Sequence, residues 1–287
     1  GRKDLEINLE EFEIGTVVKL LDEIGIKNIE DKIKFWAIFG GIPKYYKLVE
    51  LLSPKSFDDF IELVFLSHFK SLLDEGNSML ISEFGGEYKI YYSCMEAIAS
   101  GKTKLSEIAS VFNSLTIANR YLDILRKEYN LVKKISPVTS DIKSKHGIYT
   151  IKNNFFTFWF RFIKRYEAYY EQKRLNEIID FFKQNFNNYL GIIFETFCLE
   201  LLKHKKILII PFSKIGKQWG KILEVPKDKN QYEIDVVALN EKTKEILFCE
   251  CKWQDGVDAG KVVENLAEKA KNVKWHNKER KESYAIF

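Results

Sequence analysis

A glutamate and a lysine two residues apart interrupt the run "ILFCECKW" (246–253), which is otherwise rich in residues that favour β-strands. Side chains alternate along a strand, so Glu250 and Lys252 are predicted on one face, with Cys249 and Cys251 on the other. Burying two opposite charges costs free energy unless both have partners. The pair therefore indicates either a structural ion pair at the end of a sheet or a polar site on one face of it.

A second carboxylate is predicted beside Glu250. The preceding run "YEIDVVAL" places Ile234 and Val236 on one face and Asp235 on the other. The segment "NEKTKE" can join the two runs as a hairpin, which would bring Asp235 next to Glu250. Two carboxylates at hydrogen-bonding distance repel each other unless a cation lies between them, and oxygen ligands of this kind suit Mg²⁺ or Mn²⁺. The spacing therefore predicts a divalent-metal site.

Two further residues are candidates for the same site. Glu195 lies in "GIIFETFCLELL", where it is a lone carboxylate on a helix with apolar flanks. Its neighbour Glu200 is expected at the surface. Gln254 is predicted to continue the strand face of Glu250 and Lys252, and it is a weaker candidate for positioning a bound group.

The elements that must position these residues occupy the C-terminal third of the chain. Residues 174–206 predict two helices broken near Asn187 and Asn188. The β-rich runs "KILIIPF", "KQWGKILEV", "YEIDVVALN" and "EILFCECKW" follow, then the amphipathic helix "GKVVENLAEKAKNV" and the short strand "SYAIF". This order predicts an α-β-β-β-α-β unit, a mixed sheet flanked by helices.

A different unit is predicted for residues 88–152. Three helices, "EYKIYYSCMEAIAS", "TKLSEIASVFN" and "LTIANRYLDILRKEYN", precede two short strands, "LVKKISP" and "GIYTIK". Three helices followed by a β-hairpin are typical of a winged helix-turn-helix. The inward face of the third helix is predicted to carry four residues: Ile117, Tyr121, Ile124 and Leu125.

The same segment holds the basic excess of the chain. Residues 101–152 contain ten Lys or Arg against four Asp or Glu, a local charge of +6, whereas the whole chain of 287 residues carries +4. This excess favours a DNA partner, although a solvated lysine-rich surface is the alternative. The candidate nucleic-acid-binding residues are Arg120 and Arg126 on the third helix and Lys143 and Lys145 in the loop of the hairpin.

Cysteine usage and hydropathy indicate the cellular compartment in which the protein is expected. The four cysteines include no CxxC pair, which predicts buried thiols in a reducing cytoplasm, neither a zinc site nor a disulfide framework. The most apolar segment, "NFFTFWFRFI" (154–163), is too short to span a membrane and contains Arg161, so no membrane partner is expected. The helix of residues 155–170 is expected to be buried between units. The first residue is Gly, which suggests a fragment of a longer protein.

The four charged residues of the predicted site resemble the motif of the PD-(D/E)xK nuclease superfamily. Glu195 on a helix, Asp235 in "EIDVVA" and the Glu250-x-Lys252 of "ECK" are similar to those of archaeal Holliday-junction resolvases and restriction-endonuclease-like domains. Ile234 stands where the superfamily often has proline, which removes no ligand. The resemblance implies that Asp235, Glu250 and Glu195 bind Mg²⁺ or Mn²⁺, and that Lys252 orients water or stabilises charge on the phosphate.

The N-terminal parts resemble a narrower family. "DKIKFWAIFGGIPKYYKLVE", the winged-helix segment and "GIYTIKNNFFTFWFRFI" are similar to archaeal AAA/STAND-type ATPases with a winged helix and a C-terminal domain of the DUF234 type. This chain lacks GxxxxGKS/T, so no ATP binding or ATPase activity is expected in it. The expected α+β organisation is a helical remnant of the ATPase lid, a winged helix-turn-helix, a helical linker and a nuclease-like domain (1–75, 76–153, 154–189 and 190–287).

Two functions remain open at this point. The first is a metal-dependent DNA endonuclease module, acting on double-stranded or branched DNA, joined to a winged-helix DNA-binding domain and to an ATPase domain missing from this chain. The second is a non-catalytic DNA-binding or regulatory arm of the ATPase, in which the nuclease-like fold serves as a scaffold.

Overall fold

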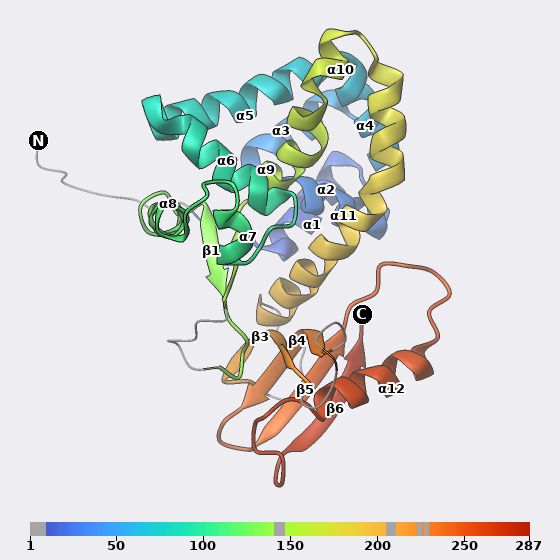
Figure 1. Ribbon diagram of the computed structural model, residues 1–287. Helices are drawn as coiled ribbons and strands as arrows, with labels where there is room; N and C mark the ends of the chain where they lie inside the picture. Colours follow the sequence, from blue (N-terminus) through green and yellow to red (C-terminus); the bar gives the residue numbers. More distant parts are fainter. Residues whose placement is uncertain (1–9, 141–146, 205–210, 223–225, 227–229) are drawn as a thin grey trace, which may run out of the picture.

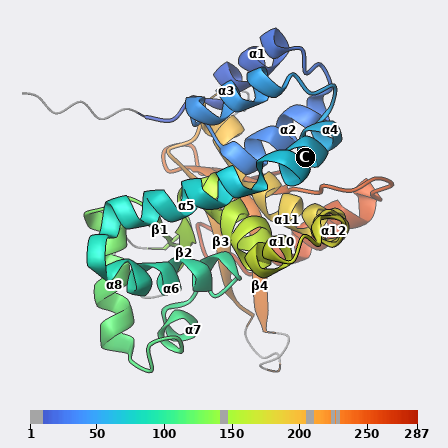
Figure 2. The same ribbon diagram turned by 90° about the horizontal axis from the view of Figure 1, so that it is seen from above.

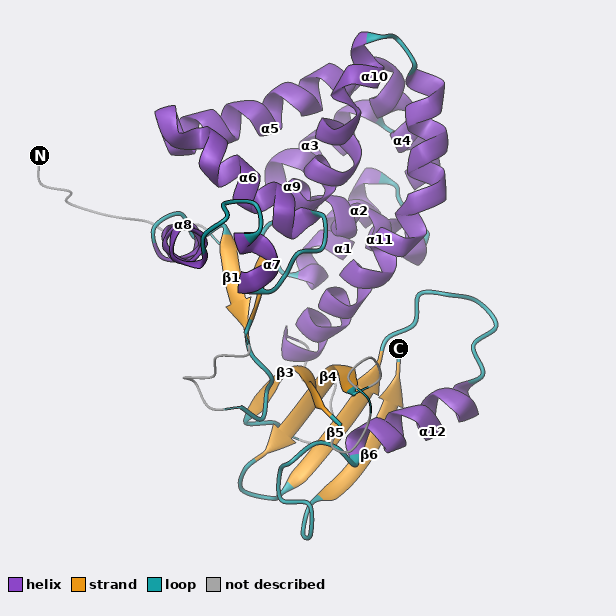
Figure 3. Cartoon of the chain, in the orientation of Figure 1, coloured by secondary structure: helices purple, strands orange, loops and turns teal. Residues whose placement is uncertain are grey.

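Two parts of different secondary structure follow one another along the chain in the computed structural model, which describes residues 10–140, 147–204, 211–222, 226 and 230–287 (Figure 1). Helices dominate the first part, and a four-stranded sheet dominates the second (Figure 3). The α+β class expected from the sequence is therefore confirmed. None of the helices in the described part of the chain is long and apolar enough to cross a membrane.

The first helices form where local start and stop signals stand in the sequence. Asn28 caps the second helix, since its side-chain oxygen accepts hydrogen bonds from two backbone N–H groups, and Gly40 at φ 57° ends that helix. Pro43 stands at the start of the third helix and Ser56 caps the fourth. The elements are α1 (Ile14–Ile24), α2 (Ile29–Phe39), α3 (Pro43–Leu52), α4 (Phe57–Leu63), a π-helical turn (Val64–His68) and α5 (Phe69–Phe84). The boundary expected between residues 75 and 76 falls inside α5.

Three helices and a two-stranded hairpin come next, in the order that the sequence predicts. After a 3-10 turn (Gly85–Glu87), they are α6 (Tyr88–Ala99), α7 (Leu105–Ala109), α8 (Leu115–Lys127), β1 (Val132–Ile135) and β2 (Ile148–Ile151). The strands pair antiparallel, with Val132 opposite Ile151. Figure 2 shows α1 to α4 and the α6–α8 helices on opposite sides of the helical part, with α5 between them.

The inward face of α8 differs from the prediction at one position. Ile117 is 44% exposed, whereas Ala118, Leu122 and Leu125 are buried. The buried residues of this helix, which begins at Leu115, recur at the helical spacing of four and three, and Ile117 lies outside that row.

The strongly apolar segment after the hairpin lies in the helical core, but it is not the single helix expected over residues 155–170, and its last element has no buried residue. It comprises α9 (Asn154–Phe158), a π-helical turn (Trp159–Ile163), a 3-10 turn (Lys164–Tyr166) and α10 (Glu167–Glu171). Trp159 is fully buried, and its indole N–H donates to the carbonyl oxygen of Leu72 on α5, 2.9 Å away. Gly76 leaves the space that this indole ring fills.

One continuous helix, α11 (Leu175–His204), connects the two parts of the molecule (Figure 1). The predicted break near Asn187 and Asn188 is therefore wrong. Buried neighbours on either side, Phe186 and Tyr189, fix the helix in the core, and the Tyr189 hydroxyl donates to the carbonyl oxygen of Ala37 at 2.7 Å. Tertiary packing of this kind outweighs the modest helix propensity of asparagine. The boundary expected between residues 189 and 190 lies inside this helix.

The C-terminal sheet has the strand order β3-β4-β5-β6. Its elements are β3 (Lys214–Lys221), β4 (Gln231–Asn240), β5 (Glu245–Glu250), α12 (Ala259–Ala270) and β6 (Lys281–Ile286). The first three strands pair antiparallel, and β6 joins β5 in parallel after the crossover through α12. The predicted α-β-β-β-α-β order is confirmed for the described residues, whereas residues 206–210 and 223–225 of the expected β-rich runs lie outside them.

The two faces of the sheet belong to different cores. Val236, Leu247 and Cys249 join the large core that includes α11, whereas Val237 and Phe248 pack with Leu266 of α12. All four cysteines are free and buried, as expected. The sheet is therefore a layer with α11 on one face and α12 on the other.

Candidate active site

Asp235 lies at an irregularity in the sheet. The pairing of β3 with β4 shifts by one residue there, so that Lys217 of β3 faces both Asp235 and Val236 of β4. This β-bulge breaks the alternation that the sequence predicts, because Ile234 packs with Val237 on the α12 side while Val236 packs on the α11 side. Bulges bend a strand and re-aim its side chains. The bulge thus decides the direction of Asp235.

Asp235 and Glu250 occupy neighbouring positions on β4 and β5. Val236 is opposite Cys249 in the antiparallel ladder, so the next residues of the two strands are Asp235 and Glu250. Both are almost fully buried, with 8% and 7% of their surfaces exposed. The backbone N–H of Cys251 donates to Oδ2 of Asp235 at 2.8 Å. The hairpin expected from the sequence therefore brings Asp235 and Glu250 to neighbouring positions on adjacent strands, and both side chains are buried.

The environment of Asp235 disfavours its ionised form. Burial raises the pKa of this carboxyl group from its usual 3.8 to about 6, and the negative charges of Glu195 and Glu250 add to the increase. The hydrogen bond from Cys251 and the positive charge of Lys217 lower the pKa but do not cancel those effects. Asp235 therefore carries a negative charge that the surrounding protein compensates incompletely.

Two lysines hold Glu250. Nζ of Lys252 lies 2.8 Å from Oε1, and Nζ of Lys269 on α12 lies 3.0 Å from both carboxylate oxygens. The strand β5 ends at Glu250, earlier than the sequence suggests, but the backbone of Lys252 still pairs with the carbonyl oxygen of Phe287 at 2.8 Å. The Lys252 side chain consequently stays beside Glu250. Burial alone would lower the pKa of Lys252, but the hydrogen bond and charge of Glu250 raise it above its usual value.

Glu195 of α11 contacts Lys217 of β3 directly. Nζ of Lys217 forms an ion pair with Oε2 of Glu195 and lies 3.6 Å from Oε1 of Glu233. Burial alone would lower the pKa of Lys217, but these carboxylates, Glu195 first, raise it above its usual value. The charge of Glu195 also acts on Asp235. The three predicted carboxylates therefore lie in one electrostatic neighbourhood, with Lys217 among them.

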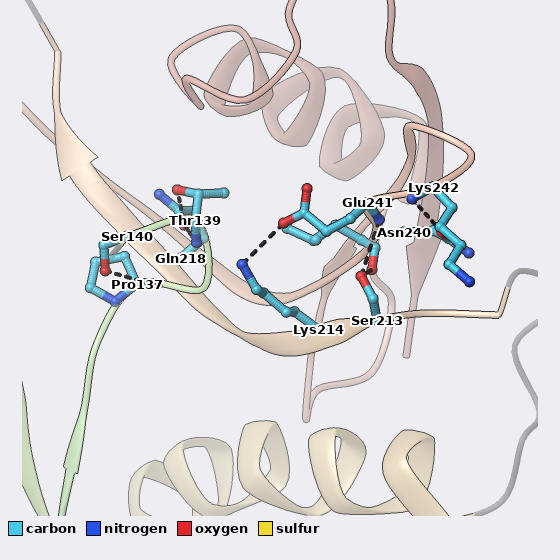
Figure 4. A network of polar contacts seen from close by, with 10 residues as sticks. Pro137, Thr139, Ser140, Ser213, Lys214, Gln218, Asn240, Glu241 and Lys242 are labelled. Carbon is cyan, nitrogen blue, oxygen red and sulfur yellow. Dashed lines mark hydrogen bonds and ion pairs between the residues drawn. The ribbon is translucent and has the colours of Figure 1, made fainter. Parts of the chain in front are cut away.

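The loop after β1 supports the strand that carries Lys217. The loop that joins β1 to β2 reaches the sheet (Figure 1), where the backbone N–H of Val138 donates to the carbonyl oxygen of Lys217 at 2.9 Å. The N–H and hydroxyl of Thr139 lie 3.2 and 3.0 Å from the side-chain oxygen of Gln218 (Figure 4). Gln218 is buried. These contacts connect the hairpin to the edge strand directly at the bulge.

A divalent cation fits part of this arrangement. Within the described residues, no group of three or more His, Cys, Asp or Glu side chains is arranged to hold a metal ion. Mg²⁺, however, usually keeps several water ligands and takes one or two carboxylates from the protein. Asp235 and Glu250 match that donor set in chemistry, and the incompletely compensated charge of Asp235 favours a cation. Glu195 forms an ion pair with Lys217, so it would act on a bound cation from outside the ligand pair of Asp235 and Glu250.

The remaining predicted residues lie away from the carboxylates. Gln254 is exposed in a bend beyond β5 and does not continue the strand face, so this prediction is wrong. Arg120 on α8 is exposed, whereas Arg126 is half-buried and its guanidinium pairs with Asp123 at 2.9 Å. Lys143 and Lys145 lie outside the described residues.

Sequence reasoning missed two residues, Lys217 and Lys269. Lys217 could have been found by the same argument that singled out Glu250, because it is a charge inside a β-rich run, "KIGKQWGK". Lys269 carried no signal, since α12 contains another lysine, Lys261, and only the crossover places Lys269 against Glu250.

Comparison with known proteins gives a family match for the C-terminal part of the chain. Residues 159–286 match the DUF234 family model, described as archaea bacterial proteins of unknown function. Across a larger part of the chain, an uncharacterized protein of Methanocaldococcus jannaschii is 31% identical over 252 residues, which is 85% of this chain and 53% of that protein. The chain therefore spans about half the length of this curated relative. No solved structure matches the chain.

Proposed function

We propose that residues 190–287 form a Mg²⁺- or Mn²⁺-dependent DNA-cleaving module of the PD-(D/E)xK type. The observation that carries this proposal is the pair Asp235 and Glu250, two buried carboxylates on neighbouring strands with the ammonium group of Lys252 beside them. Buried like charges cost stability, so their juxtaposition calls for a reason other than folding. The α-β-β-β-α-β order around them is consistent with that class of nuclease.

Each side chain has a task in phosphodiester hydrolysis. Asp235 and Glu250 hold the cation, which when bound polarises the scissile phosphate and lowers the pKa of a water ligand. Lys252, whose side chain is about one-third exposed, can reach past Glu250 to stabilise negative charge on the phosphate. Glu195 orients a water molecule and keeps Lys217 in place through their ion pair.

The three-helix unit with its hairpin supplies DNA binding in this proposal. Exposed Arg120 on α8 is available for phosphate contact, whereas Arg126 would first have to leave Asp123. Replacing Arg120 with glutamine should weaken DNA binding and lower its dependence on salt concentration, since each released counterion contributes to that dependence. A gel-shift titration at several salt concentrations measures both quantities.

The longer protein is proposed to couple this module to an ATPase domain. The chain spans 53% of its curated relative, which leaves room for a further domain in a protein of that length. The full-length protein should then contain GxxxxGKS/T, and ATP should change its rate of DNA cleavage. Absence of that motif from the full-length sequence would contradict the coupling.

The decisive test of cleavage uses plasmid, branched and single-stranded DNA with Mg²⁺ or Mn²⁺. Asp235→Asn and Lys252→Met should each lower the cleavage rate on the order of a hundredfold, since each removes a group from the reacting centre. Lys242→Met, which changes an exposed lysine in the turn after β4, is the matched control and should cleave like the unmodified protein. Equal cleavage by all four proteins would trace the activity to a contaminant and refute the assignment.

A non-catalytic scaffold is the second candidate, and one observation favours it. Lys217, Lys252 and Lys269 already neutralise Glu195 and Glu250 without any metal. If the folded protein binds DNA through Arg120 but cleaves none of the substrates with either metal, the carboxylates and lysines form a structural network. The protein would then be a DNA-binding or regulatory arm.

A further inference from the structure

A cavity lies in the helical part of the molecule, away from the carboxylates. Its volume is about 580 Å³, and its walls come from α6, from the turns between Trp159 and Tyr166, and from α11. Cavities of this size accept small organic ligands up to a mononucleotide. The cavity therefore lies between the three-helix unit and the helical segment that follows the hairpin.

The charges around this cavity are mostly positive. Arg161, Arg165 and Lys102 line it, against one acid, Glu96. Lys102 Nζ lies 3.2 Å from the hydroxyl of Ser110, and Glu96 accepts a hydrogen bond from the Tyr92 hydroxyl at 3.2 Å. Neither arginine forms an ion pair with a carboxylate of the described residues, whereas the neighbouring Lys164 pairs with Glu167.

Arg161 is held in place with most of its donors unused. Its Nε donates to the carbonyl oxygen of Ala99, the last residue of α6, at 2.6 Å. Its other N–H groups meet no acceptor among the residues that the structure describes. Burial lowers the pKa of Arg161, and the nearby positive charge of Arg165 lowers it further. A half-buried guanidinium beside a second one gains most from an anion, which can accept two parallel hydrogen bonds from the planar fork.

Aromatic rings support both guanidinium groups. Cζ of Arg161 lies 5.8 Å from the ring centroid of Tyr189, and Cζ of Arg165 lies 5.7 Å from that of Phe181. These cation–π contacts hold the two guanidinium groups beside the aromatic side chains of the cavity wall. Asn188 lines the same wall and can add an amide hydrogen bond.

We propose that this cavity binds a phosphate monoester attached to a planar base. The phosphate dianion would lie between Arg161 and Arg165, with Lys102 at the rim, and the base would lie along the aromatic wall. Three cations against one acid match a dianion better than a monocarboxylate. The same chemistry is present in a free nucleoside monophosphate and in the 5′-phosphorylated end of a nucleic-acid strand.

Isothermal titration of the whole chain at low salt tests the proposal. The probes are AMP, adenosine, inorganic phosphate, and one short oligonucleotide with either a 5′-phosphate or a 5′-hydroxyl end. AMP or the 5′-phosphorylated oligonucleotide should bind, adenosine and the 5′-hydroxyl oligonucleotide should bind at least tenfold more weakly, and phosphate should compete. Preference for AMP identifies a free nucleotide as the ligand, and preference for the phosphorylated oligonucleotide identifies a strand end.

Variants connect that binding to the cavity. Arg165→Gln changes an exposed side chain and should weaken binding about tenfold or more, the equivalent of one lost charge-assisted hydrogen bond. Arg161→Lys keeps the charge but loses the fork, and should weaken binding similarly. Lys47→Gln on α3 is the control for a lost surface charge and should bind like the unmodified protein. No binding of any phosphate probe by the folded protein, or unchanged affinity in both arginine variants, would overturn the proposal.

Discussion

Replacing Asp235 with asparagine is expected to stabilise the protein at neutral pH in the absence of divalent metal. The carboxyl group is buried, and its pKa of about 6 lies above the usual 3.8. An unfolded chain releases this proton near pH 3.8, whereas the folded chain keeps it until about pH 6. The folded state therefore binds more protons between these pH values, and the free energy of unfolding falls as pH rises through them. Above about pH 6 the full cost of the buried charge remains.

The size of the effect follows from the difference between the two pKa values. About two pKa units correspond to roughly 3 kcal/mol, which is an upper limit because neighbouring groups adjust to the new charge. Asparagine has nearly the same shape, carries no charge, and its side-chain oxygen can still accept the hydrogen bond from the Cys251 backbone. We expect a gain of about 1–3 kcal/mol in the free energy of unfolding at pH 7.5 and almost none at pH 4.

Thermal unfolding with a chelator present measures this difference. For a chain of this size, each kcal/mol shifts the midpoint by about 2–4 °C, so Asp235→Asn should unfold several degrees above the unmodified protein at pH 7.5. Asp255→Asn, at an exposed position in the bend after β5, is the control and should change the midpoint by about 1 °C or less. A variant that is less stable at pH 7.5, or a gain that persists unchanged at pH 4, would refute the reasoning.

Two further predictions concern the packing that supports the sites. Gly76→Ala should lower the free energy of unfolding by about 2 kcal/mol or more, because an added Cβ would stand 2.2 Å from the Trp159 ring. Gly191→Ala on α11 is the matched control: its added Cβ meets nothing within 4 Å, so it should raise the free energy of unfolding by about 1 kcal/mol. Equal unfolding midpoints for the two variants would contradict this prediction. Arg280→Lys should lower the free energy of unfolding, measured in urea, by about 2 kcal/mol. The buried guanidinium donates to three carbonyl oxygens in and after the last turn of α12, the first being that of Ala270, and an ammonium group cannot span them. Unchanged stability would show that those carbonyl oxygens find other donors.

Local patterns in the sequence determined the elements of the sheet region and the neighbouring positions of Asp235 and Glu250. The short turn between β4 and β5 was sufficient to place Asp235 and Glu250 at neighbouring positions on the two strands, because a short hairpin allows few registers. The amphipathic stripe of α12 and the apolar run of α9 likewise specified their own burial. Each of these features depends on residues close together in the chain, where period and turn chemistry act directly.

The tertiary structure alone decided what surrounds the carboxylates. Lys269 reaches Glu250 through the crossover of α12, and Lys217 reaches Glu195 from an edge strand, so each ion pair joins elements whose mutual placement no local pattern specifies. The bulge beside Asp235 depends on a register shift against β3, which alternation within one strand cannot reveal. The continuity of α11 depends on packing against the helical core, in which Phe186 and Tyr189 are buried. The sequence thus determined which groups could do chemistry, and packing between distant segments determined their charges and their directions.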